Sequence, residues 1–167
     1  QLRSFTYKAE SIDYLRVLGL KSEFLEYLKH FRFKGKIFSV REGELVFPNE
    51  PIVRIEASLP EAQLIETLLL NILNFQSLVA TKAFRVKLAA NGKNFSDFGL
   101  RRSHGFGGLM ASRAAIIGGA SSTSNVQAGF IYGLPVSGTM AHSWVQSFDG
   151  ELTAFRTYAK INPKNSI

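Results

Sequence analysis

Apolar residues return at helical spacing in the N-terminal part of the chain. Residues 11–31 read as helical turns, with one apolar face formed by Phe24, Leu25, Leu28 and Phe31. Ser22 precedes that face and is predicted to be the N-cap of its helix, because its hydroxyl can accept a hydrogen bond from a free backbone N–H group.

The pattern then changes to short β-type runs at 36–40, 44–47 and 51–59. Turn signals separate them, Glu42-Gly43 between the first two and 48–50 between the last two. These runs predict a small antiparallel sheet.

A long apolar segment begins at Pro60, which is predicted to be the first residue of a helix because its missing N–H is not needed there. The helix is expected to reach about 91–92 with one interruption. Polar residues such as Glu66, Asn71 and Asn74 interrupt its most apolar part, 64–80, and disfavour a membrane span of about 20 residues. We therefore expect a buried helix of a soluble protein.

Composition changes at Gly92, after which most of the 14 glycines occur, mixed with serine, threonine and alanine. Glycine-rich loops between short apolar elements allow the backbone to approach a ligand closely. We place a domain boundary there, with one domain over 1–91 and another over 92–167. Alternating apolar runs and the helical pattern of 151–161 predict an α/β class for the second domain, as in an α/β barrel.

The chain carries a net charge of +7, with a pI near 9.8, which favours anionic partners. It contains no cysteine, which excludes disulfides and thiolate zinc sites and is compatible with a reducing compartment. No secretory pattern opens the chain, so we expect a cytoplasmic protein.

Acidic residues are absent between Asp97 and Asp149, whereas five basic side chains fall in this interval: Arg101, Arg102, Arg113, His104 and His142. Such a stretch can hold an anion without repulsion between like charges, and paired arginines match the planar shape of a carboxylate or the oxygens of a phosphate. The alternative is that these arginines are exposed on a loop surface and the interval arises by chance.

Several familiar site patterns are weak or missing. The run 121–125 could cap a helix facing a phosphate, or simply be a capping loop, and 105–108 does not complete G-x-G-x-x-G because Met110 takes the last position. No G-x-S-x-G elbow occurs. The histidines at 30, 104 and 142 lack the spacing of a zinc helix, so we predict no metal ligands in the chain. His142 follows a predicted strand end at 136–139, where a neutral imidazole could attack phosphorus or carry a proton, although a structural role is commoner for such a histidine.

Five segments in order resemble the nicotinate phosphoribosyltransferase family: FPNEP (47–51), ETLLLNILNF (66–75), DFGLRR (97–102), TSNV (123–126) and GTMAHS (138–143). The resemblance covers essentially the whole chain. It implies a partial open-faced α/β sandwich domain followed by the start of an irregular α/β barrel, as in type II phosphoribosyltransferases. The family joins nicotinate and 5-phosphoribosyl 1-diphosphate with ATP hydrolysis to give nicotinate mononucleotide in NAD salvage.

The same resemblance implies roles for individual residues. His142 occupies the position of the histidine that ATP phosphorylates, Arg101 that of an arginine binding the nicotinate carboxylate or a nearby phosphate, and Thr139 that of a residue seating the pyridine ring. Further substrate contacts are expected from Arg102, Ser124, Gly138 and Ser143. Mg²⁺ is expected with the diphosphate substrate, and the active site is expected to be completed in a homodimer.

Other functions remain open at this point. The related nicotinamide enzyme carries an acidic residue near TSNV, where this chain has Ser122 to Asn125, so nicotinate is favoured over nicotinamide. A nicotinamide- or quinolinate-type phosphoribosyltransferase is the alternative. A non-catalytic basic binding module and a structural subunit that binds nothing are further alternatives, but the basic residues are dispersed and do not interleave with aromatics as in nucleic-acid binders. Neither nucleic acid nor membrane is expected as a partner. Because the family chain is more than twice this length, we expect an internal fragment that is inactive alone.

Overall fold

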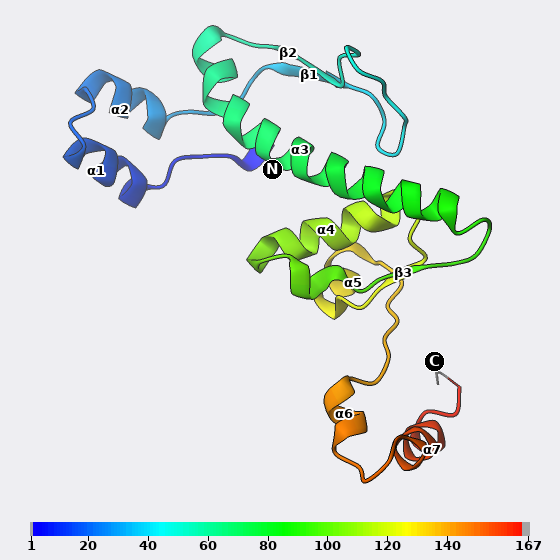
Figure 1. Ribbon diagram of the computed structural model, residues 1–167. Helices are drawn as coiled ribbons and strands as arrows, with labels where there is room; N and C mark the ends of the chain where they lie inside the picture. The colour runs from blue at the N-terminus through cyan, green and yellow to red at the C-terminus, as the bar shows by residue number, and fades with distance from the viewer. Residues whose placement is uncertain (1, 165–167) are drawn as a thin grey trace. The chain divides into compact units, whose positions relative to one another are not determined.

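The computed structural model describes residues 2–164 of the chain (Figure 1). It divides into two compact units, 1–72 and 73–167. The architecture is mixed α/β and mostly helical, which confirms the α/β class. The predicted domain division at 91 and 92 stays a prediction.

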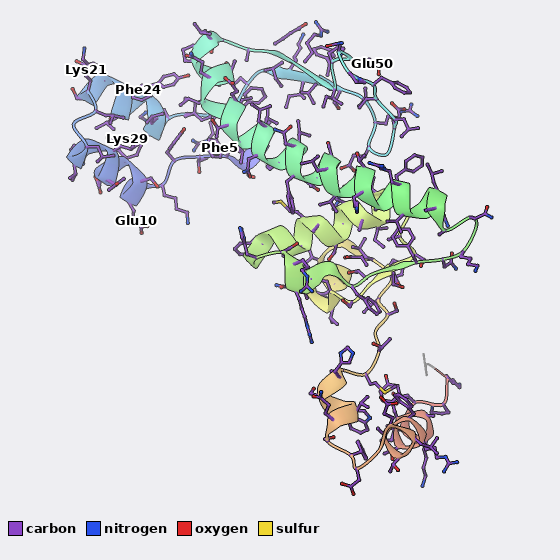
Figure 2. The ribbon with its side chains drawn as sticks, viewed as in Figure 1. Phe5, Glu10, Lys21, Phe24, Lys29 and Glu50 are labelled. Carbon is purple, nitrogen blue, oxygen red and sulfur yellow. The ribbon has the colours of Figure 1, made fainter. Side chains whose placement is uncertain are left out.

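The first unit begins with η1 (Leu2–Ser4), followed by two helices that contact each other, α1 (Ala9–Val17) and α2 (Ser22–Lys29). Its core contains Ile12, Leu25 and Leu28, and Leu64 packs against this cluster. Phe31, buried beside α2, contacts the rings of Phe5, Tyr7 and Tyr27. The predicted apolar face of the second helix is therefore largely confirmed, although Phe24 lies 41% exposed and projects from α2 in Figure 2.

Ser22 is not the N-cap that its sequence position predicts. The N-cap of α2 is Lys21, and Ser22 is already the first helical residue, with its hydroxyl 3.4 Å from the Glu23 carboxylate. A side chain inside the first turn no longer faces the free N–H groups of residues two or three positions on, so the capping prediction is wrong.

Two strands form the antiparallel sheet, β1 (Lys36–Ser39) and β2 (Val53–Glu56), in a register that pairs Ile37 with Ile55. The predicted third strand at 44–47 is wrong. Glu44 accepts a hydrogen bond from Arg41 N, and Glu50 accepts one from Phe47 N, so local turns use the backbone donors that a strand would need. Figure 2 shows Glu50 in the loop that joins β1 to β2.

Helix α3 (Leu59–Ala89) runs without interruption, contrary to the sequence prediction, and begins one residue before Pro60. Ser58 accepts the first helical hydrogen bond from Ala62, while Glu61 accepts from both the Ser58 backbone N and its hydroxyl. Glu61 thus forms its half of an S-x-x-E capping box by accepting from the Ser58 backbone N–H, while the Ser58 hydroxyl donates to the same carboxylate. Pro60 remains inside the first turn, where its missing N–H costs nothing.

The burial predicted for the long helix is wrong along much of its length. Ile65 and Ala83 are buried, but Leu70, Leu78 and Leu88 are 49%, 71% and 63% exposed. By length and composition α3 could cross a membrane, a test that core helices of soluble proteins pass equally well.

The second unit contains the end of α3 and a short parallel sheet. Strand β3 (Ser96–Asp97) is followed by η2 (Gly99–Arg102) and α4 (Gly105–Ile117), and β4 (Ser122–Thr123) is followed by α5 (Val126–Tyr132). The chain ends with α6 (His142–Gln146) and α7 (Glu151–Ile161), the latter as predicted.

The core of this unit is built from small residues where α3 meets α4. Ala83, Ala115 and Ala120 are buried together. A β-carbon added to Gly118 would lie 2.3 Å from the Ala80 carbonyl oxygen. The two backbones can approach this closely because position 118 has no side chain.

Candidate functional site

Three strand segments of the second unit lie side by side and run parallel. β3 pairs with β4 through Ser96↔Ser122 and Asp97↔Thr123, and Thr123 also forms a parallel bridge with Val136. Parallel strands bring their carboxyl ends to one edge, which is where α/β proteins bind ligands. The bridge confirms that residues 136–139 open from a strand end.

The residues predicted to contact substrate follow these three ends. Arg101 and Arg102 come four and five residues after Asp97, Ser124 comes directly after β4, and Gly138 and Thr139 come shortly after Val136. Segments separated by up to about 40 residues in sequence therefore leave the same edge of one sheet. Figure 1 shows β3 beside α4 and α5, and α4 contacts both strands of the sheet.

The arginines lie in the η2 turn, and both side chains are exposed. Neither forms an ion pair within residues 2–164. Arg113 differs, because it is half-buried on α4 with its guanidinium 6.0 Å from the Tyr132 ring. The acid-free interval thus supplies two exposed guanidinium groups and one that packs against α5.

Asp97, at the end of β3, is the carboxylate nearest to this edge, and sequence reasoning gave it no role. Its Oδ1 accepts a hydrogen bond from Gly99 N at 2.9 Å, and its Oδ2 accepts one from the Thr123 hydroxyl at 3.1 Å. A carboxylate followed two residues later by glycine is the sequence signal that could have identified it, because an Asp side chain can accept from the backbone N–H two residues on.

The TSNV segment is mainly structural. Asn125 is 4% exposed and caps α5 by accepting a hydrogen bond from Ala128 N. Its amide nitrogen donates to the Gly108 carbonyl at 3.3 Å and to the Ser112 hydroxyl at 3.2 Å. The predicted capping role of the 121–125 run is confirmed. α5 has only seven residues, and its N-terminal groups are occupied by this cap.

Hydroxyl groups gather on the other face of the sheet. Ser122 lies 2.7 Å from the Ser96 hydroxyl and 2.6 Å from that of Ser137. Ser124 follows β4 in a bend and takes no part in these contacts that the structure records. The hydroxyls of Ser96, Ser122 and Ser137 therefore bond to one another across the three strand segments.

His142 is the first residue of α6, and its side chain is exposed, as are those of Thr139 and Ser143. The helix is fixed by Trp144, whose indole N–H donates to the Ala154 carbonyl at 3.4 Å and whose ring contacts Tyr158 edge-on. Thr139 donates its hydroxyl to the Met140 carbonyl at 3.3 Å. Trp144 was missed from the sequence, although it is the single tryptophan and stands two residues after the histidine.

The resolved pKa shifts lie away from these residues, in the first unit. Burial raises the pKa of Tyr7. The Lys29 ammonium lowers the pKa of Glu26, chiefly through a hydrogen bond, and the Ser58 hydroxyl lowers the pKa of Glu61 in the same way. These carboxylates are structural, since Glu61 forms the capping box and Glu26 pairs with Lys29 at 2.7 Å.

An open hollow also lies in the first unit, between α2 and the start of α3. Residues of mixed charge line it, including Glu26, His30, Arg32 and Glu61. None of the predicted substrate contacts lines this hollow, and its charged groups carry no common sign. In residues 2–164 no group of three or more histidine or acidic side chains could hold a metal ion.

Comparisons with known proteins agree on one family. Residues 1–74 match the model of the nicotinate phosphoribosyltransferase N-terminal domain. The chain is 50% identical to nicotinate phosphoribosyltransferase of Bacillus subtilis, over 96% of this chain and 33% of the relative. It is 44% identical to a nicotinate phosphoribosyltransferase of Mycobacterium tuberculosis, over 99% of this chain and 36% of the relative.

Two solved structures resemble the chain, one of them bearing the same family name. The crystal structure of human nicotinic acid phosphoribosyltransferase matches 88% of this chain and 31% of that one, with a TM-score of 0.80 and 38% identity. Nicotinate-nucleotide pyrophosphorylase from Pyrococcus furiosus matches 76% of this chain and 33% of that one, with a TM-score of 0.72 and 31% identity. The chain spans about a third of the length of the curated relatives it matches.

Proposed function

This chain belongs to the nicotinate phosphoribosyltransferase family, and from that premise we propose that the protein joins nicotinate to 5-phosphoribosyl 1-diphosphate with ATP hydrolysis. The products are nicotinate mononucleotide, diphosphate, ADP and phosphate, and the reaction is an entry step of NAD salvage. The observation that carries the proposal is the identity of 44–50% along 96–99% of the chain to relatives bearing that name.

The finer fold is part of the same proposal. Residues 1–91 correspond to part of an open-faced sandwich domain with connecting helices, and residues 92–167 to the start of an irregular α/β barrel of the type II phosphoribosyltransferase kind. The parallel pairing of β3 with β4 and the bridge to Val136 support the barrel, since neighbouring barrel strands are parallel.

Arg101 is proposed to bind the nicotinate carboxylate or a neighbouring phosphate, with Arg102 beside it. A guanidinium offers two parallel N–H donors to a carboxylate, and the exposed η2 turn leaves this group accessible. Ser124, Gly138, Thr139 and Ser143 are proposed as further substrate contacts, with Thr139 beside the pyridine ring. Position 124 carries an uncharged serine. An acidic side chain at that position would repel an anionic substrate such as nicotinate.

His142 is proposed to take the phosphoryl group of ATP. A neutral imidazole nitrogen attacks the γ-phosphorus, the bond to the β,γ-bridging oxygen breaks, ADP leaves and the imidazolium proton passes to solvent. Water later cleaves the P–N bond and releases phosphate. Hydrolysis of this labile bond supplies the free energy that favours nucleotide formation.

Transfer to ribose joins the pyridine nitrogen to C1 of the sugar while the bond from C1 to the diphosphate oxygen breaks. Positive charge develops at the ribose ring, so the reaction depends on positioning two anions around that carbon. Mg²⁺ is proposed to enter with the diphosphate substrate, since residues 2–164 contain no cluster of histidine or acidic side chains that could hold it.

We place the protein in the cytoplasm as a homodimer whose partner completes the site, with neither nucleic acid nor membrane as a partner. The likeness to a nicotinate-nucleotide pyrophosphorylase is the observation that keeps a related pyridine substrate as the second candidate. Nicotinamide and quinolinate are therefore the competing substrates in the test.

The test uses the complete gene product that carries this chain. Nicotinate mononucleotide should form from nicotinate and 5-phosphoribosyl 1-diphosphate, faster with ATP, and much more slowly from nicotinamide or quinolinate. Labelled ATP should leave acid-labile phosphate on His142, and His142→Ala should lose both the label and the ATP stimulation while slow transfer persists. Unchanged stimulation in that variant would remove the proposed role of His142, and absence of product with every pyridine substrate would remove the proposed activity.

A further inference from the structure

The two oxygens of the Asp97 carboxylate contact different loops. Oδ1 accepts a hydrogen bond from Gly99 N at 2.9 Å, in the turn that follows β3. Oδ2 accepts one from the hydroxyl of Thr123 at 3.1 Å, at the end of β4. One half-buried side chain thus bridges the exits of two neighbouring strands.

The contact on the β3 side fixes the start of the arginine turn. Gly99 is the first residue of η2, and Arg101 and Arg102 are its last two. A β-carbon on Gly99 would lie 3.0 Å from the Asp97 oxygen, closer than side chains normally pack, so the glycine permits the approach. The orientation of the turn therefore depends on this hydrogen bond.

The contact on the β4 side is with a rigid partner. Thr123 is 0% exposed, and its hydroxyl also accepts a hydrogen bond from Asn125 N at 3.1 Å. Asn125 in turn caps α5 and contacts α4 through Ser112. Asp97 is consequently hydrogen-bonded to a buried residue of the unit. Through its second oxygen it can restrain the exposed η2 turn.

The carboxylate is satisfied by uncharged donors, although two arginines follow it closely in sequence. Neither Arg101 nor Arg102 forms an ion pair in the part of the chain that the structure describes. An ion pair between Asp97 and either arginine would compete with an anionic substrate for the guanidinium. The observed arrangement leaves both positive charges available.

We propose that Asp97 is a positioning residue, whose carboxylate holds the η2 turn against β4 through Gly99 and Thr123 so that Arg101 presents its guanidinium to an anionic substrate. The inference rests on the proposed function for the identity of that substrate, nicotinate. Asp97 thus orients the η2 turn and does not neutralise the charge of Arg101 or Arg102.

The test compares Asp97→Ala with Asp97→Asn in the complete gene product. Asparagine keeps an oxygen that can accept from Gly99 N, and its NH₂ can meet a rotated Thr123 hydroxyl, whereas alanine removes both contacts. Asp97→Ala should raise the KM for nicotinate about tenfold with kcat changed less than about threefold, and Asp97→Asn should stay within about threefold in both. Asp13→Asn, in an exposed pair with Arg16, is the matched control and should change neither constant. An equal rise in KM for the two variants would show that the charge of Asp97 matters, and no rise for either would show that its hydrogen bonds do not; each result would overturn the proposal.

Hydrogen exchange gives a second readout that needs no activity. Asp97→Ala and Thr123→Val should each speed amide exchange in the peptide containing Gly99–Arg102 by at least about tenfold, and Thr123→Ser should restore the slow rate. If the protein lacks transferase activity, the proposed function fails, while faster exchange still supports the positioning role. Unchanged exchange in both Asp97→Ala and Thr123→Val would overturn that role whatever the activity.

Discussion

The indole N–H of Trp144 donates a hydrogen bond to the backbone carbonyl of Ala154, with 3.4 Å between nitrogen and oxygen. This contact links α6, which begins at His142, to Ala154, the buried residue of α7. The ring also contacts Phe148 and Tyr158, with centroids 5.1 Å and 6.3 Å apart. The exposed His142 therefore belongs to a short helix that the side chain of Trp144 attaches to α7.

Replacing that side chain should loosen the histidine helix. Trp144→Phe keeps an aromatic ring but loses the donor, and should cost about 1 kcal/mol of unfolding free energy. Trp144→Ala also removes the ring contacts, should cost about 2–4 kcal/mol, and should reduce ATP stimulation several-fold. Phe155→Ala, at a 44% exposed ring on α7, is the control. Full ATP stimulation in a folded Trp144→Ala protein would contradict the link between this contact and His142.

Arg101 offers a test of substrate recognition. Arg101→Ala should raise the nicotinate requirement by about one to two orders of magnitude while changing the ATP requirement little, because a charge-assisted pair with the carboxylate is lost. Arg101→Lys should rescue it only partly, since an ammonium cannot form the paired hydrogen bonds. Arg156→Ala, on the exposed surface of α7, should leave both requirements unchanged. Steady-state kinetics decides the matter, and equal changes for nicotinate and ATP would count against the assignment.

Gly118 tests the packing of α3 on α4. Gly118→Ala would place a methyl group 2.3 Å from the Ala80 oxygen and 2.7 Å from the Ala83 β-carbon, so a helix must move. We expect a loss of about 1–3 kcal/mol in unfolding free energy, measured by urea denaturation. Gly150→Ala is matched in chemistry, but its β-carbon would meet nothing within 4 Å, so a change of only a few tenths of a kcal/mol is expected. Equal losses in the two variants would show that helix contact is not the cause.

Glu61 makes stability depend on acidity. The Ser58 hydroxyl and backbone donors lower the pKa of Glu61 below its ordinary value near 4.5 in the folded protein. The folded state therefore holds the proton less tightly, and the stabilisation is present above that value and lost as the pH falls from it through the lowered pKa. Unfolding free energies measured down through this window should fall less steeply for Glu61→Gln than for the unchanged protein. Parallel curves would contradict the role of the capping box in acid sensitivity.

Local patterns predicted those elements whose stability is local. The helix at 151–161 and the strand beginning at Lys36 follow from apolar spacing alone. The start of α3 and the loop at 44–47 were mispredicted because Glu61, Glu44 and Glu50 use their carboxylates to bind backbone N–H groups. Such side-chain competition for the backbone is not visible in hydrophobic periodicity.

The order of the five motifs indicated the family, and with it the residues for which roles are proposed. Such motifs consist of residue types at fixed spacing along the chain, and the sequence contains that information directly. Only the tertiary structure showed that Arg101, Ser124 and Thr139 follow adjacent ends of one parallel sheet, and that Asp97 binds Gly99 and Thr123 instead of an arginine. The reason is physical: strand pairing and a hydrogen bond across 26 residues depend on which backbone segments meet in space, and neither leaves a periodic trace in the sequence.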